Sequence, residues 1–173
     1  MMTPDAIGPL SRLVDTNRMP AKGSEVHVHA TEEECRALAR DFKIPAIRAL
    51  TGDYVLDKTA KGIHVRGIVR ADITQTCVAT LEDFDSSVEE EVEVDFAQPE
   101  GMPAAPPTDE HDYEPPDEIV NGRIDLGALT AEFLVLGLDP YPRKPGAAFE
   151  GGDGDRDESP FAALAKLKEQ GGG

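Results

Sequence analysis

Alternating apolar and polar residues mark several segments of the chain as strands with one buried face. Residues 24–30 alternate in this way, and residues 47–56 and 63–73 form two longer runs on either side of a turn at 59–62. A period of two is what a pleated strand with one buried face requires. We therefore expect a strand at 24–30, followed later by an antiparallel hairpin.

Two further segments show the same period. Residues 10–15 are short and partly alternating, whereas residues 82–96 alternate along a long stretch. In the longer stretch, valines and Phe96 share one face, and the other face carries Glu89, Glu91, Glu93 and Asp95. Both segments are predicted to be strands, the second with an acidic, solvent-facing side.

Two helices are predicted from their start and stop signals. Thr31 and Glu34 form a capping box ahead of apolar residues at helical spacing, and Pro45 ends that helix. Asp125 is a good cap for the second helix, which Pro140 and Pro142 end. The second helix is expected to turn an apolar stripe toward the protein core. This stripe consists of Leu126, Leu129, Phe133 and Leu136.

The predicted class is α+β, with a strongly curled antiparallel sheet and two main helices. Two sheet forms fit the sequence, a layer covered by the helices or a barrel-like sheet. Residues 1–142 are expected to form one domain, in which 97–118 is a long, mobile, acidic, proline-rich loop. Residues 143–158 are predicted to be a disordered linker, and 159–168 a short amphipathic helix.

Charge is distributed unevenly along the 173 residues, whose formal net charge is −17. Residues 1–81 hold 11 Lys/Arg and 10 Asp/Glu, whereas residues 82–118 hold 15 Asp/Glu and no Lys/Arg. Such an acidic block repels bare nucleic acid and attracts basic partners. A purely solubilising role for the block is the alternative.

Composition limits the cellular setting. The chain has two cysteines, no run approaching the roughly 20 apolar residues of a membrane span, and an N-terminus unlike a signal peptide. We therefore expect a reduced, cytoplasmic protein.

The order of these elements, together with particular residues, resembles the YceD family. The shared pieces are the strand-strand-helix start, the basic hairpin ending in 73–77, the acidic strand 88–96, the segment 124–129 leading into a leucine-rich helix, and the closing motif 159–164. The resemblance covers roughly residues 10–168. It implies a role in the accumulation of large-subunit ribosomal RNA, with a ribosomal protein or a large-subunit precursor particle as partner, and without a defined mechanism.

Metal or catalytic chemistry finds little support in the sequence. Many family members carry a C-x-x-C pair at the hairpin end, but here Cys77 is followed by Thr80 in the position of the second cysteine. A closed zinc site needs four ligands, and His27 and His29 share a strand face as many histidines do by chance. We expect no enzymatic activity, no metal and no cofactor.

Binding residues can be proposed on three segments. Candidate phosphate or RNA contacts on the hairpin are Arg48, Lys58, Lys61, Arg66 and Arg70. Candidate contacts to a basic partner are Glu89, Glu91, Glu93 and Asp95, and a candidate docking helix presents Phe161, Leu164 and Leu167. A solvated hairpin face, and a terminal helix packed back on its own domain, are the alternatives.

Three functional hypotheses follow. The first is a non-enzymatic factor in ribosome biogenesis that binds a precursor particle or a ribosomal protein. The second is an acidic chaperone for a basic ribosomal protein, and the third is a module that binds RNA directly through the hairpin. The oligomeric state is left open.

Overall fold

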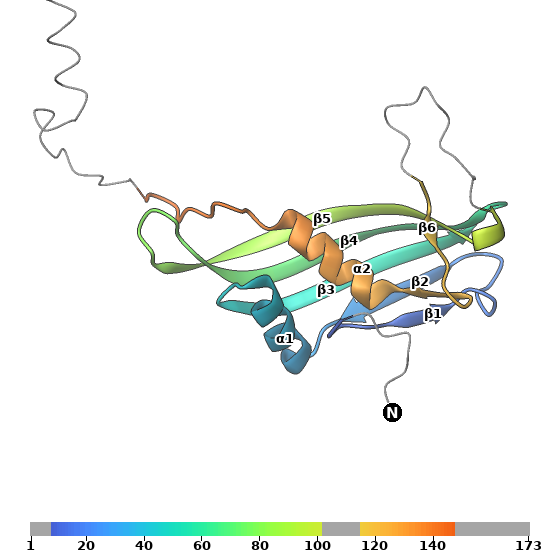
Figure 1. Cartoon of the computed structure of the whole chain (residues 1–173), viewed down its shortest axis with the longest axis horizontal. Helices are drawn as coiled ribbons and strands as arrows, with labels where there is room; N and C mark the ends of the chain where they lie inside the picture. Colours follow the sequence, from blue (N-terminus) through green and yellow to red (C-terminus); the bar gives the residue numbers. More distant parts are fainter. Residues whose placement is uncertain (1–7, 102–114, 148–173) are drawn as a thin grey trace, which may run out of the picture.

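A five-stranded sheet with two helices on one side forms the frame of the protein (Figure 1). The computed structural model describes residues 8–101 and 115–147. In chain order the elements are β1 (Leu13–Asp15), β2 (Ser24–His29), α1 (Glu32–Phe42), β3 (Ala46–Lys58), β4 (Gly62–Thr76), β5 (Asp83–Ala97), the 3-10 turn η1 (Pro99–Gly101), β6 (Asp117–Glu118), β7 (Arg123–Asp125) and α2 (Leu126–Gly137). The α+β class is confirmed.

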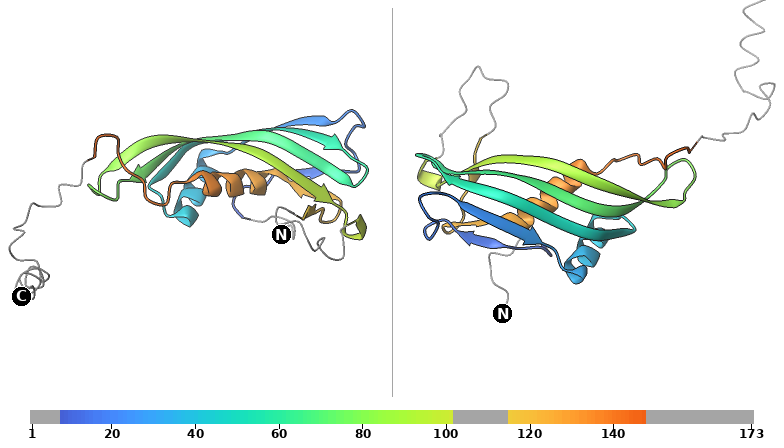
Figure 2. Two further views of the ribbon diagram at one scale, coloured as in Figure 1. Left: turned by 90° about the horizontal axis from the view of Figure 1, so that it is seen from above. Right: turned by 180° about the vertical axis from the view of Figure 1, so that it is seen from behind.

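The main sheet has the strand order β2-β3-β4-β5-β6. Its pairs are antiparallel, except that the short β6 runs parallel to the end of β5. Because β2 and β6 lie at opposite edges of the sheet, it does not close, and the barrel-like form expected as one alternative is wrong. Figure 2 shows the sheet as an arched layer with both helices on its concave side.

Strands β3 and β4 form the hairpin that alternation predicts. The turn is closed by the amide of Thr59, which donates to the carbonyl of Gly62 at 2.9 Å, and by the amide of Gly62, which donates to the Thr59 hydroxyl at 3.1 Å. A Cβ at Gly62 would collide with the carbonyl oxygen of Phe96, so a side chain cannot be placed where β4 meets β5. On β4 the predicted apolar face is buried, and the predicted polar residues His64, Arg66, Arg70 and Asp72 face away from the helices.

Helix α1 begins and ends as its sequence predicts. Both hydrogen bonds of the capping box between Thr31 and Glu34 are present. The helix ends when Lys43 adopts a left-handed conformation (φ 57°), two residues before Pro45. A bidentate pair with Arg12, at 2.8 and 2.9 Å, lowers the pKa of the Glu34 carboxyl and ties the helix to the segment before β1.

Helix α2 buries the predicted stripe only in part: Leu126 and Leu129 are buried and Phe133 packs against the core. Asp125 caps it as expected, accepting from the amides of Gly127 and Ala128. Leu136, however, is 67% exposed, whereas Thr130 and Leu134 are fully buried. The helix is apolar on nearly every side, so its hydrophobic pattern does not select a face. The face is set instead by close approaches to other elements. Gly127 lies against the backbone of 11–12, Thr130 against β3, and Gly137 against side chains of β5.

Strand β1 lies within the segment 10–15 that was predicted to be a strand, whereas its partner β7 was not predicted. Strands β1 and β7 pair with each other in the register Val14↔Ile124 and stand apart from the main sheet. The chain runs from β6 to β7 through a turn at Asn121 and Gly122, both with positive φ (51° and 70°). The end of β5, the turn η1 and the short β6 fall within the segment 97–118 that was expected to be a loop. Residues 102–114 lie outside the described part of the chain. Within residues 8–101 and 115–147, no helix has the length and apolar composition needed to cross a bilayer.

Candidate functional site

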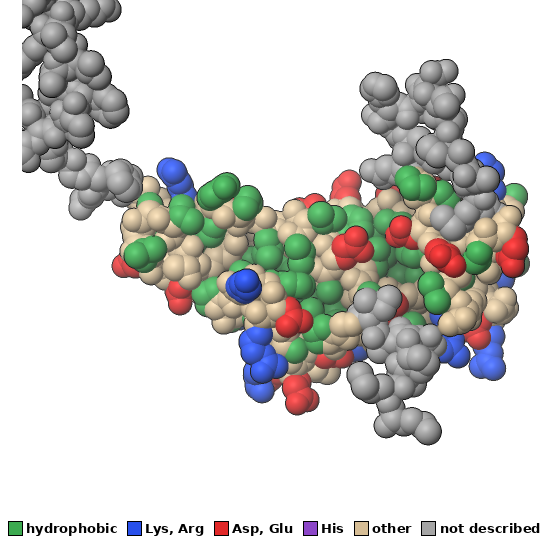
Figure 3. Space-filling view, viewed as in Figure 1, with side chains coloured by type: hydrophobic (Ala, Val, Ile, Leu, Met, Phe, Trp, Pro, Cys, Tyr) green, Lys and Arg blue, Asp and Glu red, His purple; other side chains and the backbone are tan. Residues whose placement is uncertain are grey.

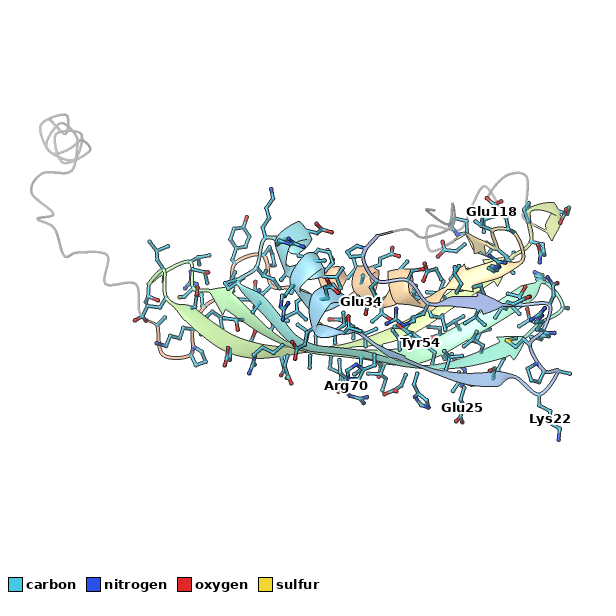
Figure 4. All side chains as sticks on the ribbon, turned by 90° about the horizontal axis from the view of Figure 1, so that it is seen from below. Lys22, Glu25, Glu34, Tyr54, Arg70 and Glu118 are labelled. Atoms are coloured by element: carbon cyan, nitrogen blue, oxygen red, sulfur yellow. The ribbon has the colours of Figure 1, made fainter. Side chains whose placement is uncertain are left out.

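The sheet face turned away from the helices, called the outer face below, carries a dense array of charges. Figure 4 shows Arg70 and Glu25 on this face, and Glu34 and Glu118 on the helix-bearing side. Strand pairing places ten carboxylates on the outer face: Glu25, Asp53, Asp57, Asp72, Asp83, Asp85, Glu89, Glu91, Glu93 and Asp95. The same face carries only three arginines and three histidines, so it is strongly acidic.

The three predicted arginines of the hairpin lie on this outer face, and each contacts a carboxylate. Arg70 donates to Glu89 at 2.8 Å and to Asp53 at 3.3 Å. Arg66 donates to Asp57 at 2.9 Å, and the guanidinium of Arg48 lies 3.3 Å from a carboxylate oxygen of Asp85. A phosphate group would have to compete with these carboxylates for each arginine.

The two predicted lysines lie elsewhere. Lys58 ends β3, and Lys61 stands in the turn before β4, so both sit at the tip of the hairpin. Neither makes an ion pair with a residue of the described ranges. The five candidate phosphate contacts are thus split into three paired arginines on the sheet and two lysines at its end.

The four predicted acidic contacts do lie together, along the outer side of β5. Glu89 contacts Arg70, while Asp95 and Glu93 approach the ring of His64 at 2.7 and 3.7 Å. Glu91 faces Ile68 across the strands and forms no ion pair with the residues described. Alternate residues along a strand are about 6.8 Å apart, which is within the screening length of about 8 Å at physiological ionic strength. An approaching cation therefore experiences these carboxylates together.

Sequence reasoning missed the acidic residues that neutralise the arginines. The carboxylate of Asp53 lies 2.8 Å from Nδ1 of His27 and also contacts Arg70. The carboxylate of Asp85 accepts a hydrogen bond from the Thr74 hydroxyl at 2.8 Å. Their phase along β3 and β5 already placed them on the polar face, so the missing information was the register between the strands.

The remaining candidates for chemistry do not assemble into a site. His29 contacts the carbonyl of Ala30 at 3.0 Å, and the described residues hold no cluster of three or more possible metal ligands. Cys77 is buried, and a hydrogen bond with the Thr80 side chain, followed by several from backbone amides, lowers its pKa to about 7. Phe161, Leu164 and Leu167 lie outside the residues that the structure describes.

Comparison with known proteins identifies a family. A family model described as "Large ribosomal RNA subunit accumulation protein YceD" matches residues 65–168, from Val65 within β4 onward, which is more than half of the chain. Neither the curated proteins nor the solved structures provide a match. The matched residues include all of β5 and its acidic outer side.

Proposed function

Because this chain belongs to the YceD family, we propose that it is a non-enzymatic accessory factor of ribosome biogenesis that acts in the cytoplasm. It supports the accumulation of large-subunit ribosomal RNA by binding a basic ribosomal protein, either free or within a precursor particle. The observation that carries this proposal is the acidic outer face, which lies mostly within the segment that matches the family.

Electrostatics favours a basic protein over RNA as the partner of the outer face. Ten carboxylates there outnumber three arginines, and all three arginines are already in contact with carboxylates. A polyanion would gain little from such a surface, whereas lysine and arginine side chains would meet carboxylates at regular intervals.

The pairs on the outer face also hold the acidic side chains in place. Exposed ion pairs contribute only about 0–1 kcal/mol each to stability, so their main effect is positional. Arg70 lies between Asp53 and Glu89, and His64 lies beside Asp95 and Glu93. A partner therefore meets carboxylates that are already ordered, which lowers the entropy cost of binding.

Sedimentation and RNA measurements test the proposal together. A tagged chain should migrate through a low-salt gradient with immature large-subunit particles or with a basic ribosomal protein. In cells that lack the native protein, the triple variant Glu89→Gln, Glu91→Gln, Glu93→Gln should lose this association and lower the ratio of large-subunit to small-subunit ribosomal RNA.

A matched control removes the same number of charges elsewhere. Glu32→Gln, Glu33→Gln and Asp41→Asn change α1, on the helix-bearing side, by the same three charges. The control should behave like wild type. Equal loss in both triple variants would show that only net charge matters, and unchanged binding in the β5 variant would refute the proposed contact.

Direct RNA binding through the hairpin is the alternative, and its support is now confined to the hairpin tip. Lys58 and Lys61 are the hairpin cations without an ion pair to a described residue. Lys58→Glu with Lys61→Glu should abolish a mobility shift with large-subunit RNA if this alternative holds. Absence of a shift for the wild-type protein at low salt would exclude it.

A further inference from the structure

A groove of about 330 Å³ lies on the helix-bearing side, at the end of the sheet where β6, the β1–β7 ribbon and the start of α2 meet. Its floor is apolar and includes Phe96, Ile124 and Leu129, which are at most 9% exposed. Two apolar side chains stand at its rim and are open to solvent, Leu13 at 40% and Val120 at 52%. In Figure 3 apolar side chains lie between acidic ones in this part of the molecule.

The walls of the groove are fixed by hydrogen bonds that cross between elements. The carboxylate of Asp125 accepts from the amide of Arg12 at 2.7 Å and from the Ser11 hydroxyl at 2.6 Å while it caps α2. The amide of Leu126 donates to the carbonyl of Arg12 at 3.0 Å, and a Cβ at Gly127 would lie 2.7 Å from the backbone of Ser11. The groove is thus preformed, because neither wall can move without breaking these contacts.

The turn that carries Val120 is also held in place. Asn121 and Gly122 have positive φ, and Val120 bridges to Arg123 across them, as in a two-residue hairpin turn. The carbonyl of Gly122 accepts from both the amide and the hydroxyl of Thr16, at 3.0 and 2.9 Å. Val120 is therefore presented to solvent by a rigid turn.

The rim of the groove is acidic. Asp117, Glu118 and Glu132 are exposed, and the carboxylate of each forms no hydrogen bond or ion pair with a described residue. Arg123 is the one cation among the lining residues, which also include the carboxylate of Asp125. An apolar floor surrounded by carboxylates is complementary to an apolar side chain flanked by lysine or arginine.

We propose that this groove binds an apolar side chain from an extended, lysine- or arginine-rich segment of a partner protein. The acidic rim excludes nucleic acid and anionic lipid, and a second copy of a chain with net charge −17 would be repelled. Its volume is at the lower end of the range of ligand pockets, about 300–1,000 Å³, which suits one or two side chains. This inference rests on the proposed function, since it specifies which part of a basic partner is held.

The test uses the full chain and two labelled peptides. The probe has the sequence Gly-Lys-Lys-Phe-Leu-Lys-Lys-Gly, and its counterpart has Ser-Ser in place of Phe-Leu. Fluorescence anisotropy should show tighter binding of the apolar peptide, and the largest amide shifts in nuclear magnetic resonance spectra should be those of Val120, Ala128 and Leu129. Val120→Asp should weaken binding of the apolar peptide by about tenfold or more, as expected for loss of an anchor contact.

Val78→Asp is the matched control, because Val78 is 47% exposed but lies in the turn after β4, away from the groove. It should leave the affinity unchanged. Both substituted positions are on the surface, and unchanged melting temperatures would show that both variants fold. Equal effects of the two valine variants, equal binding of the two peptides, or shifts outside the groove would each overturn the inference.

The β5 variants separate this inference from the proposed function. If the Glu89, Glu91 and Glu93 substitutions abolish association with ribosomal particles while Val120→Asp changes nothing, the groove inference fails and the proposed function stands. The opposite result is that Glu118→Lys with Glu132→Lys weakens binding of the apolar peptide while the β5 variants keep full association with ribosomal particles. In that case the partner contacts the groove and not the outer face.

Discussion

The buried hydrogen bond between Tyr54 and Thr130 gives the most specific stability prediction. It is 2.7 Å long and joins β3 to α2, with Tyr54 2% exposed and Thr130 fully buried. The Thr130 hydroxyl also donates to the carbonyl of Leu126 at 2.6 Å. Since a hydroxyl has only one proton to donate, Tyr54 must be the donor and Thr130 the acceptor.

This assignment makes the two single substitutions unequal. Thr130→Val leaves the Tyr54 hydroxyl buried without an acceptor, which costs about 1–3 kcal/mol. Tyr54→Phe removes the donor but leaves Thr130 bonded to Leu126, so the expected loss is the net value of one hydrogen bond, about 0.5–1.5 kcal/mol. The double variant should lose less than the sum of the two, because neither orphaned group remains.

Urea unfolding followed by circular dichroism measures all four proteins of this double-mutant cycle. For a chain of this length, each 1 kcal/mol corresponds to about 2–4 °C in melting temperature, so thermal melts provide an independent check. A Tyr54→Phe variant that is less stable than Thr130→Val would refute the donor assignment. Strict additivity would show that the two side chains are not energetically coupled.

Four further predictions concern single sites. Because the pKa of Glu34 is lowered in the folded protein, the stability that its carboxylate contributes is present at pH values above its ordinary pKa of 4.5 and is lost as pH falls below it. The difference in unfolding free energy between wild type and Glu34→Gln should therefore shrink below about pH 4.5. Burial raises the pKa of Tyr54 to about 12, so wild type should lose stability relative to Tyr54→Phe as pH rises from about 10 to 12 in urea titrations. Gly67→Ala should lower the unfolding free energy by about 1–3 kcal/mol or more in urea titrations, because the added Cβ would lie 2.6 Å from the buried ring of Tyr54. The thiolate absorbance of Cys77 should increase with pH with a midpoint near pH 7, and Thr80→Val should move that midpoint to higher pH.

Strand phases and helix caps were predictable because they depend on neighbouring residues. The alternation of β4 and β5 already specified which side chains are buried, and the capping box of α1 needed only Thr31 and Glu34. The buried face of α2 was predictable only in part, since Leu126 and Leu129 of the expected stripe are buried but Leu136 is not. Leu136 and Leu134 are equally apolar, and what separates them is the close approach of Gly127 and Gly137 to other parts of the chain.

Pairing between distant segments carried the rest of the information. The groove exists because Val14 pairs with Ile124, more than a hundred residues later, and no local pattern signals such a contact. The Asn121-Gly122 turn is a strong hairpin signal, but the strands beside it have only two and three residues and show no period of their own.

The same long-range information changes how the basic hairpin is understood. In sequence, Arg66 and Arg70 stand in the less acidic half of the chain and suggest an anion-binding surface. In the sheet, β4 lies between β3 and β5, so each arginine is flanked by carboxylates from a neighbouring strand, as Arg70 is by Asp53 and Glu89. The arginines therefore fix the positions of the carboxylates while the net field of the outer face stays negative. A partner selected by that field must be cationic, and removing Arg70 should strengthen the attraction of the face for a basic partner while loosening its geometry.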